Sequence, residues 1–209
     1  MKPRTLGLFL LGAALGGCTL SVTASRPRPN IALSARPEKL TLQLEHDVRD
    51  RYQVPAQQGI KPIDVNDWHV SLRSGFDAAF RNTFQGSGDP LVLSIERADL
   101  VLTPSAVGVQ SMRTTRVSRR SRVQRTTVQT GVTAVRARIT YRAQLLDRSG
   151  KVLATSAATA ESKGSTTVAS EEEMTRLSGD AIETMYEMIA ADLFKTAPAA
   201  APPASAGLK

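Results

Sequence analysis

Cysteine, histidine and aromatic residues are scarce in this chain of 209 residues. The single cysteine, Cys18, cannot form an internal disulfide. The two histidines, His46 and His69, lack the cysteine or carboxylate spacing of a zinc site, so we expect surface or capping roles for them and no metal. Aromatics make up 4% of the residues, which leaves few platforms for stacking nucleic-acid bases and requires a largely aliphatic core.

Sequence motifs of catalysis are also missing. There is no Gly-x-Ser-x-Gly elbow, no glycine-rich phosphate loop and no HExxH helix. Asp47, Asp50 and Asp64 could in principle act in a hydrolase, but their spacing does not require it. The sequence therefore favours a protein that is not an enzyme and has no cofactor, with an envelope hydrolase as the weaker alternative.

The amino terminus carries the pattern of an export signal. Lys2 and Arg4 precede an apolar run, Leu6–Leu15, that is shorter than the roughly 20 residues a membrane-spanning helix needs. We therefore expect residues 1–17 to be a signal peptide that is removed.

Leu15-Gly16-Gly17-Cys18 resembles the lipobox of bacterial lipoproteins. The resemblance implies a diacylglyceryl group on the Cys18 thiol, cleavage before Cys18 and acylation of its new amino group. Such an anchor binds the membrane durably, because each buried methylene group contributes about 0.8 kcal/mol. Thr19 stands where enterobacterial lipoproteins of the inner membrane tend to have aspartate, which favours the outer membrane, facing the periplasm. The alternative is an ordinary signal peptide with Cys18 as a chance residue.

The first half of the mature chain mixes polar segments with periodic ones. Ser, Arg, Pro and Ala dominate up to Pro37, which predicts that residues 18–37 are the lipidated cysteine and a flexible tether. Leucines alternate over 39–45, a strand pattern, and a polar stretch over 47–64 predicts a long loop. Asp67 is a candidate cap for an amphipathic helix over 68–84, whose apolar stripe, widened by Val70, should face the core.

The second half predicts strands and a closing helix. The apolar phase of a strand over 91–102 shifts near Glu96, which indicates a bulge. A hairpin is predicted by apolar alternation over 137–145 and 152–160 on either side of a turn at 147–150. Ser170 and Glu173 have the spacing of a capping box, which predicts a helix that starts there and ends near Phe194. We expect one α+β domain, residues 38–195, with two helices packed on one face of a mainly antiparallel sheet, and a disordered Ala/Pro tail, 196–209.

The charge of the chain is strongly positive and unevenly placed. The formal charge is +8, or +6 without Lys2 and Arg4. Residues 110–142 hold nine arginines and no acidic residue, and mutual repulsion among them requires counter-charge. The planar guanidinium binds phosphate or carboxylate through two hydrogen bonds, so the run can bind anions. The plainer interpretation is a solvated face on a long exposed hairpin or a mobile loop. The anion-binding candidates are Arg113, Arg116, Arg119, Arg120, Arg122 and Arg125.

The signal, strand, helix, hairpin and last helix together resemble the lipopolysaccharide-assembly lipoproteins over Lys39–Phe194. That resemblance implies a protein that plugs a β-barrel translocon and contacts lipopolysaccharide through basic residues. A second similarity, to the YajG-like lipoproteins, lies in Leu40–Leu44 followed by Asp47-Val48-Arg49-Asp50-Arg51.

The leading hypothesis is a non-enzymatic envelope lipoprotein. It would bind the membrane through its lipid and an anionic component (lipopolysaccharide, phospholipid or acidic glycan) or a barrel or transporter partner. Export argues against nucleic acid as the anionic partner. The alternative is an accessory structural lipoprotein of a secretion or motility complex, in which the arginines are merely solvated.

Overall fold

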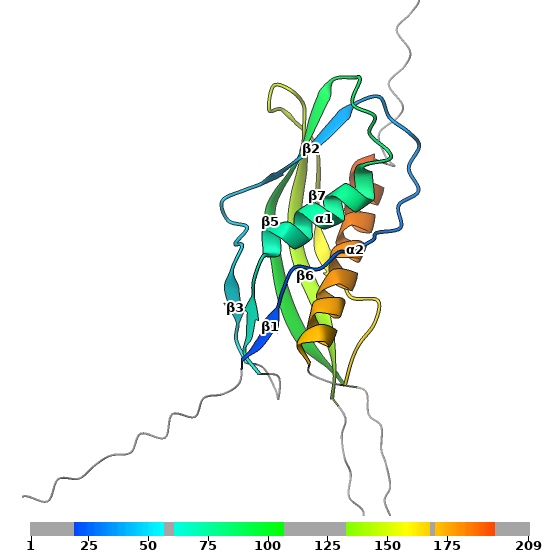
Figure 1. Cartoon of the computed structure of the whole chain (residues 1–209). Coiled ribbons are helices and arrows are strands. Elements are labelled where there is room, and N and C mark those ends of the chain that lie inside the picture. Colours follow the sequence, from blue (N-terminus) through cyan, green and yellow to red (C-terminus); the bar gives the residue numbers. More distant parts are fainter. Residues whose placement is uncertain (1–18, 57–60, 107–132, 168–169, 195–209) are drawn as a thin grey trace, which may run out of the picture.

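The computed structural model describes residues 19–56, 61–106, 133–167 and 170–194 (Figure 1). Two helices and two β-sheets form one α+β domain, and both helices pack on one face of the larger sheet. The elements are β1 (Leu20–Val22), β2 (Lys39–Leu44), β3 (Tyr52–Val54), β4 (Ile63–Val65), α1 (Trp68–Phe80), β5 (Pro90–Ala106), β6 (Thr133–Leu146), β7 (Val152–Glu161) and α2 (Glu171–Phe194). This confirms the predicted fold class.

The larger sheet has the strand order β2-β5-β6-β7, in which β2 runs parallel to β5 and the remaining pairs are antiparallel. The predicted bulge at Glu96 is confirmed, because the pairing of β5 with β6 changes register between Ile95 and Arg97. The extra residue keeps both apolar series on the core side: Ile95 before the bulge and Ala98 after it are buried.

The predicted hairpin of β6 and β7 is also confirmed. Its turn places Gly150 in the left-handed region, with φ of 83°, where a side chain would be strained. The Asp147 carboxylate accepts hydrogen bonds from the Ser149 hydroxyl and from the backbone N–H groups of Ser149 and Lys151, which hold the pKa of Asp147 below its usual value.

Apolar side chains of both helices form the core with the sheet. In α1 the predicted stripe is buried at Trp68, Leu72 and Phe80, but the helix ends at Phe80, and Val70, expected to widen the stripe, is 55% exposed. Ser170 caps α2 as predicted, with a hydrogen bond of 3.2 Å from the Glu173 N–H to the Ser170 hydroxyl, whereas the Glu173 carboxylate accepts hydrogen bonds from Arg176. Within the described ranges no helix has the length and apolar character to cross a membrane.

Two predictions about irregular structure are wrong. The segment expected to be a tether is ordered from Thr19: it begins with β1, which pairs with β4, and it then packs against both helices. Val22 is 1% exposed, so this short strand contributes to the core despite its polar neighbours. The expected long loop over 47–64 contains β3 and β4, which complete a small sheet of order β1-β4-β3.

The start of α1 is capped by a residue distant in sequence. Asp67 has a left-handed backbone, with φ of 54°, and its side chain makes no capping hydrogen bond, which corrects the prediction. Asp50 takes this role: its Oδ1 accepts a hydrogen bond of 2.8 Å from the His69 N–H, and its carbonyl accepts one of 3.1 Å from the Trp68 N–H. The free N–H groups of the helix start are thus satisfied from the preceding loop.

We expect Asp50→Ala to lower the free energy of unfolding by about 1 kcal/mol, because the first turn of α1 loses its side-chain acceptor. Asp47→Ala is the matched control, since the Asp47 side chain is 91% exposed and lies 3.6 Å from the exposed His46 ring. Urea unfolding of both variants measures the difference. Equal stability of the two variants would show that Asp50 does not cap the helix.

Candidate functional site

The face of the larger sheet that points away from the helices carries basic side chains. Alternation along β6 buries Ile139 and Tyr141 and exposes Arg136, Arg138 and Arg142 on the other face. Each of these arginines has a carboxylate near it: Glu161 lies 3.7 Å from Arg136 and 2.7 Å from Arg138, and Glu96 lies 3.5 Å from Arg142. The three arginines of β6 therefore have the counter-charge expected for the arginine-rich run, from Glu96 of β5 and Glu161 of β7, although exposed pairs of this kind contribute only about 0–1 kcal/mol each.

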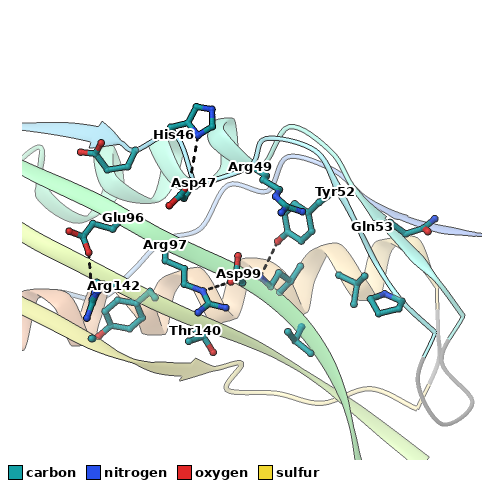
Figure 2. Close-up of a pocket in the computed structure, with 17 residues that line it drawn as sticks. His46, Asp47, Arg49, Tyr52, Gln53, Glu96, Arg97, Asp99, Thr140 and Arg142 are labelled. Carbon is teal, nitrogen blue, oxygen red and sulfur yellow. Dashed lines mark hydrogen bonds and ion pairs between the residues drawn. The ribbon is translucent and has the colours of Figure 1, made fainter.

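An open groove of about 1370 Å³ lies beside this face (Figure 2). One wall is the chain from Glu45 to Pro55, and the other side is formed by β5 and β6 with one contact from β7. The bulge of β5 delivers Glu96 and Arg97 to the groove, and Thr140 and Arg142 reach it from β6. The groove thus joins segments that are far apart in the sequence.

Three basic side chains in the groove each lie close to a carboxylate. Arg97 is bonded to Asp99, Arg142 lies 3.5 Å from Glu96, and His46 lies 3.6 Å from Asp47 (Figure 2). These groups present hydrogen-bond donors and acceptors side by side on the groove surface. Such a surface fits a polar molecule or a peptide segment.

Tyr52 connects the wall of the groove to β5 and α1. Its hydroxyl accepts a hydrogen bond of 2.9 Å from the Leu100 N–H, and its ring meets the Trp68 indole edge to face at 6.4 Å between centroids. Burial raises the pKa of Tyr52 well above its usual value, so the phenol stays neutral at physiological pH. Tyr52 therefore positions the groove wall against β5.

The three aspartates considered for catalysis do not converge. Asp47 lines the groove, whereas Asp50 caps α1 and Asp64 accepts a hydrogen bond of 2.9 Å from the Gln53 amide. His46 is fully exposed, and His69 contacts the Val48 carbonyl through Nε2 at 2.6 Å, which agrees with the surface and capping roles expected for the histidines. In the described part of the chain, no three His, Cys, Asp or Glu side chains are grouped to hold a metal ion.

The residues predicted to carry function lie elsewhere. Cys18 and the six anion-binding candidates, Arg113, Arg116, Arg119, Arg120, Arg122 and Arg125, fall outside the described residues. The groove, in contrast, was not predicted. Its only signal in the sequence is the cluster of charges that follows the bulge, Glu96, Arg97 and Asp99, on a strand that is otherwise apolar.

These features define a small α+β domain with two helices on one sheet face and a solvent-exposed opposite face that carries paired charges. The profile of the Lipopolysaccharide-assembly (LptE) family matches residues 59–196, which is more than half of the chain. The chain therefore belongs to the lipopolysaccharide-assembly family.

No curated protein matches the sequence. Among solved structures, the chain is similar to the crystal structure of a minor lipoprotein from Acinetobacter baumannii, with 18% identity, 75% of this chain and 90% of that chain covered, and a TM-score of 0.37.

Family membership confirms part of what the sequence predicted. Members of this family are lipopolysaccharide-assembly lipoproteins of the outer membrane that face the periplasm, and the chain shares this class and this location. Membership is consistent with the expectation that the chain is not an enzyme. The signal peptide, the lipobox and the similarity to YajG-like lipoproteins stay predictions.

Proposed function

We propose that this protein is held on the outer membrane by acylated Cys18 and assists lipopolysaccharide assembly by binding lipopolysaccharide phosphates through its arginine-rich run, beside a β-barrel partner. One observation carries the proposal: the family match over residues 59–196 includes the whole run. The lipid anchor is supported by the Leu15-Gly16-Gly17-Cys18 motif after a signal-like segment.

The distribution of acidic residues supports an anionic ligand. No acidic residue occurs between Asp99 and Asp147, and the carboxylates that approach the arginines of β6 come from Glu96 and Glu161, outside that stretch. The remaining six arginines of the run are concentrated within Arg113–Arg125. Phosphate groups of lipid A match the two-donor geometry of guanidinium and would neutralise this charge.

We expect Arg119→Ala, Arg120→Ala and Arg122→Ala, combined in one variant, to weaken lipopolysaccharide binding by roughly tenfold to a hundredfold, because each ionic contact with phosphate at a solvent-exposed surface contributes about 0.5–1 kcal/mol. The dependence of affinity on salt should become shallower, since fewer ionic contacts form. Titration of the full mature protein with purified lipopolysaccharide at several salt concentrations measures both effects.

The matched control removes the same charge from another region. Lys39, Arg148 and Lys151 are exposed, and their combined alanine variant also loses three positive charges. Its affinity should stay close to that of the wild type. If both variants lose affinity equally, the protein binds through net charge alone and the assignment to the run is wrong.

Docking to a protein is the second candidate, favoured by the groove beside the exposed sheet face. A single β-barrel protein that co-purifies in stoichiometric amount, unaffected by the arginine substitutions, would assign the interaction to this face. Loss of that protein from the arginine variant would instead place the run at the protein interface.

A further inference from the structure

The larger sheet ends in β7, which has a neighbouring strand on one side. The strand order is β2-β5-β6-β7, so in the part of the chain that the structure describes β7 pairs with β6 alone. A register shift between Leu145 and Leu146 of β6 interrupts the pairing near the start of β7 and leaves residues 154–161 as its regular part. The outer side of this segment is an open strand edge.

The register shows which backbone groups of β7 point outward. The Ser162 N–H donates to the Ala137 carbonyl of β6 at 2.8 Å, which marks this pair as the hydrogen-bonded type. Hydrogen-bonded pairs alternate with non-bonded pairs along an antiparallel ladder. Counted back along the register, Ser156, Ala158 and Ala160 bond to β6, and the residues between them turn their N–H and C=O groups to the open side. These outward residues, all with exposed side chains, are Thr155, Ala157 and Thr159.

Where β2 ends, β5 is also a sheet edge, but its outward groups have partners. The Ala98 carbonyl accepts a hydrogen bond from the Trp68 indole, and the Leu100 N–H donates to the Tyr52 hydroxyl, both at 2.9 Å. Pro104 has the same orientation as Leu100, because it lies an even number of residues further along the strand, and it has no N–H to donate. This edge therefore resists the addition of a further strand.

The other strand edges are short or flanked by charge. β1 and β3 have three residues each, and β2 has six, with Lys39 at its start and Glu45 directly after its end. Proteins commonly protect edges in these ways, because an open edge pairs with other chains. The regular part of β7 lacks such protection, since residues 154–160 include no charged residue, no proline and no glycine. Among the described strands, β7 is thus the long edge that stays open to pairing.

The chemistry of β7 defines what can cover its edge. Outward N–H and C=O groups at every second residue match an extended backbone. The charge that ends the segment, Glu161, is already engaged, because its carboxylate lies 2.7 Å from Arg138 and 3.7 Å from Arg136. At the start of β7, Val152 and Leu153 are 46% and 51% exposed and offer apolar surface. An extended, uncharged polypeptide segment therefore fits this edge better than a charged ligand.

A different protein fits the edge better than a second copy of this chain. α2 lies against β7, where the Ser156 hydroxyl donates a hydrogen bond of 2.6 Å to Asp192. Antiparallel pairing of two β7 strands would place two α2 helices side by side on the same face of the joined sheet. Each α2 has seven acidic residues and one arginine, so the two helices would repel each other.

We propose that β7 binds an extended, uncharged segment of a partner protein, which adds to the four-stranded sheet as a fifth strand. The proposal rests on the β-barrel partner proposed above, and it specifies the surface and the kind of contact. Backbone hydrogen bonds provide the affinity of such a contact, and alternate side chains of the added strand provide its specificity. The contact does not depend on lipopolysaccharide binding by the arginine-rich run.

Hydrogen exchange of the β7 amides tests the added strand directly. The full mature protein is purified alone and in complex with the β-barrel protein that co-purifies with it. In the free protein the outward amides of Thr155, Ala157 and Thr159 should exchange much faster than those of Ser156 and Ala158, which bond to β6. In the complex all of them should be protected, and the exchange of the three outward amides should slow by roughly tenfold or more.

A proline at an outward position removes one donor and leaves the ladder with β6 intact. Thr155→Pro should unfold at the urea concentration of the wild type and bind the barrel protein roughly tenfold more weakly or worse, because a carbonyl of the added strand loses its donor. Thr159→Pro is a second, independent variant with the same expected result. Asp89→Pro is the matched control at an exposed position just before β5, and its affinity should equal that of the wild type.

Three outcomes would overturn the proposal, and they differ in what else they affect. Outward amides that exchange as fast in the complex as in the free protein, or folded proline variants that bind as the wild type does, would overturn the added strand and leave the protein partner in place. Protection of these amides that grows with the concentration of the free protein would assign the edge to a second copy instead. Absence of a stoichiometric barrel protein, with lipopolysaccharide still bound, would overturn the partner and the added strand together and leave the role of the arginines intact.

Discussion

Trp68→Ala is expected to lower the free energy of unfolding by about 4 kcal/mol, within the range measured for removal of large buried aromatic side chains. Trp68 is 1% exposed and begins α1. Its indole Nε1 donates a hydrogen bond of 2.9 Å to the Ala98 carbonyl of β5, and its ring packs against Tyr52 of β3. One side chain thus joins the first helix to both sheets, so its removal leaves a cavity where three elements meet.

Two other variants separate the contribution of the indole hydrogen bond from that of side-chain burial to the loss of stability. Trp68→Phe keeps an aromatic ring but leaves the Ala98 carbonyl without its donor, and we expect a smaller loss of about 2 kcal/mol. Val70→Ala, at a position that is 55% exposed in the same helix, should change stability by less than about 0.5 kcal/mol. Because Trp68 is the only tryptophan, unfolding in urea must be followed by circular dichroism. A loss below about 1 kcal/mol for Trp68→Ala would contradict the packing described here.

Sequence patterns predicted the elements that repeat regularly. The hairpin of β6 and β7 and the long helix α2 appear where alternation and helical spacing placed them. The bulge at Glu96 was visible because a bulge shifts the apolar phase of a strand by one residue. In each case the information lies in the order of neighbouring side chains, which is what a sequence displays directly.

The N-terminal strap, residues 19–37, could not be predicted from the order of neighbouring side chains. Its composition is that of a tether, and the groups that hold it are mostly backbone N–H groups, which every residue but proline possesses. Their acceptors are distant in sequence: Glu183 is 155 residues from Arg28, and Glu187 is 157 residues from Asn30. The cap of α1 by Asp50 escaped prediction for the same reason, since the acceptor belongs to another segment.

The candidate site was only partly predictable. The charge of the arginine-rich run is a property of composition and was apparent at once. The groove forms because the chain from Glu45 to Pro55 lies beside β5 and β6. These strands follow up to about a hundred residues later in the sequence, so no local pattern encodes the contact. The ion pairs Arg142–Glu96 and Arg138–Glu161 likewise became visible only once the strand register was known.

The contact between the two helices and the strap depends on one glycine. A Cβ atom added at Gly75 of α1 would lie 2.8 Å from Cγ2 of Ile182 and from Cε2 of Tyr186, and 3.0 Å from Cγ of Pro27. Ile182 and Tyr186 are buried, and the Tyr186 hydroxyl donates a hydrogen bond of 2.8 Å to the Leu72 carbonyl, so neither side chain can move aside easily. The absence of a side chain at Gly75 is what allows α1, α2 and the strap to meet.

Gly75→Val is accordingly expected to lower the free energy of unfolding by about 3 kcal/mol, because overpacking outweighs the gain in helix propensity. Gly179→Ala in α2 is the control: its Cβ would meet Ser25 at an ordinary 3.5 Å, and a better helix former there should leave stability unchanged or raise it by up to about 1 kcal/mol. Hydrogen exchange of the Arg28 and Asn30 amides reports on the strap, and both should exchange faster in Gly75→Val than in Gly179→Ala. If Gly75→Val is as stable as the wild type and its strap amides stay protected, the helices do not meet at Gly75 as described, and the strap does not depend on their close approach.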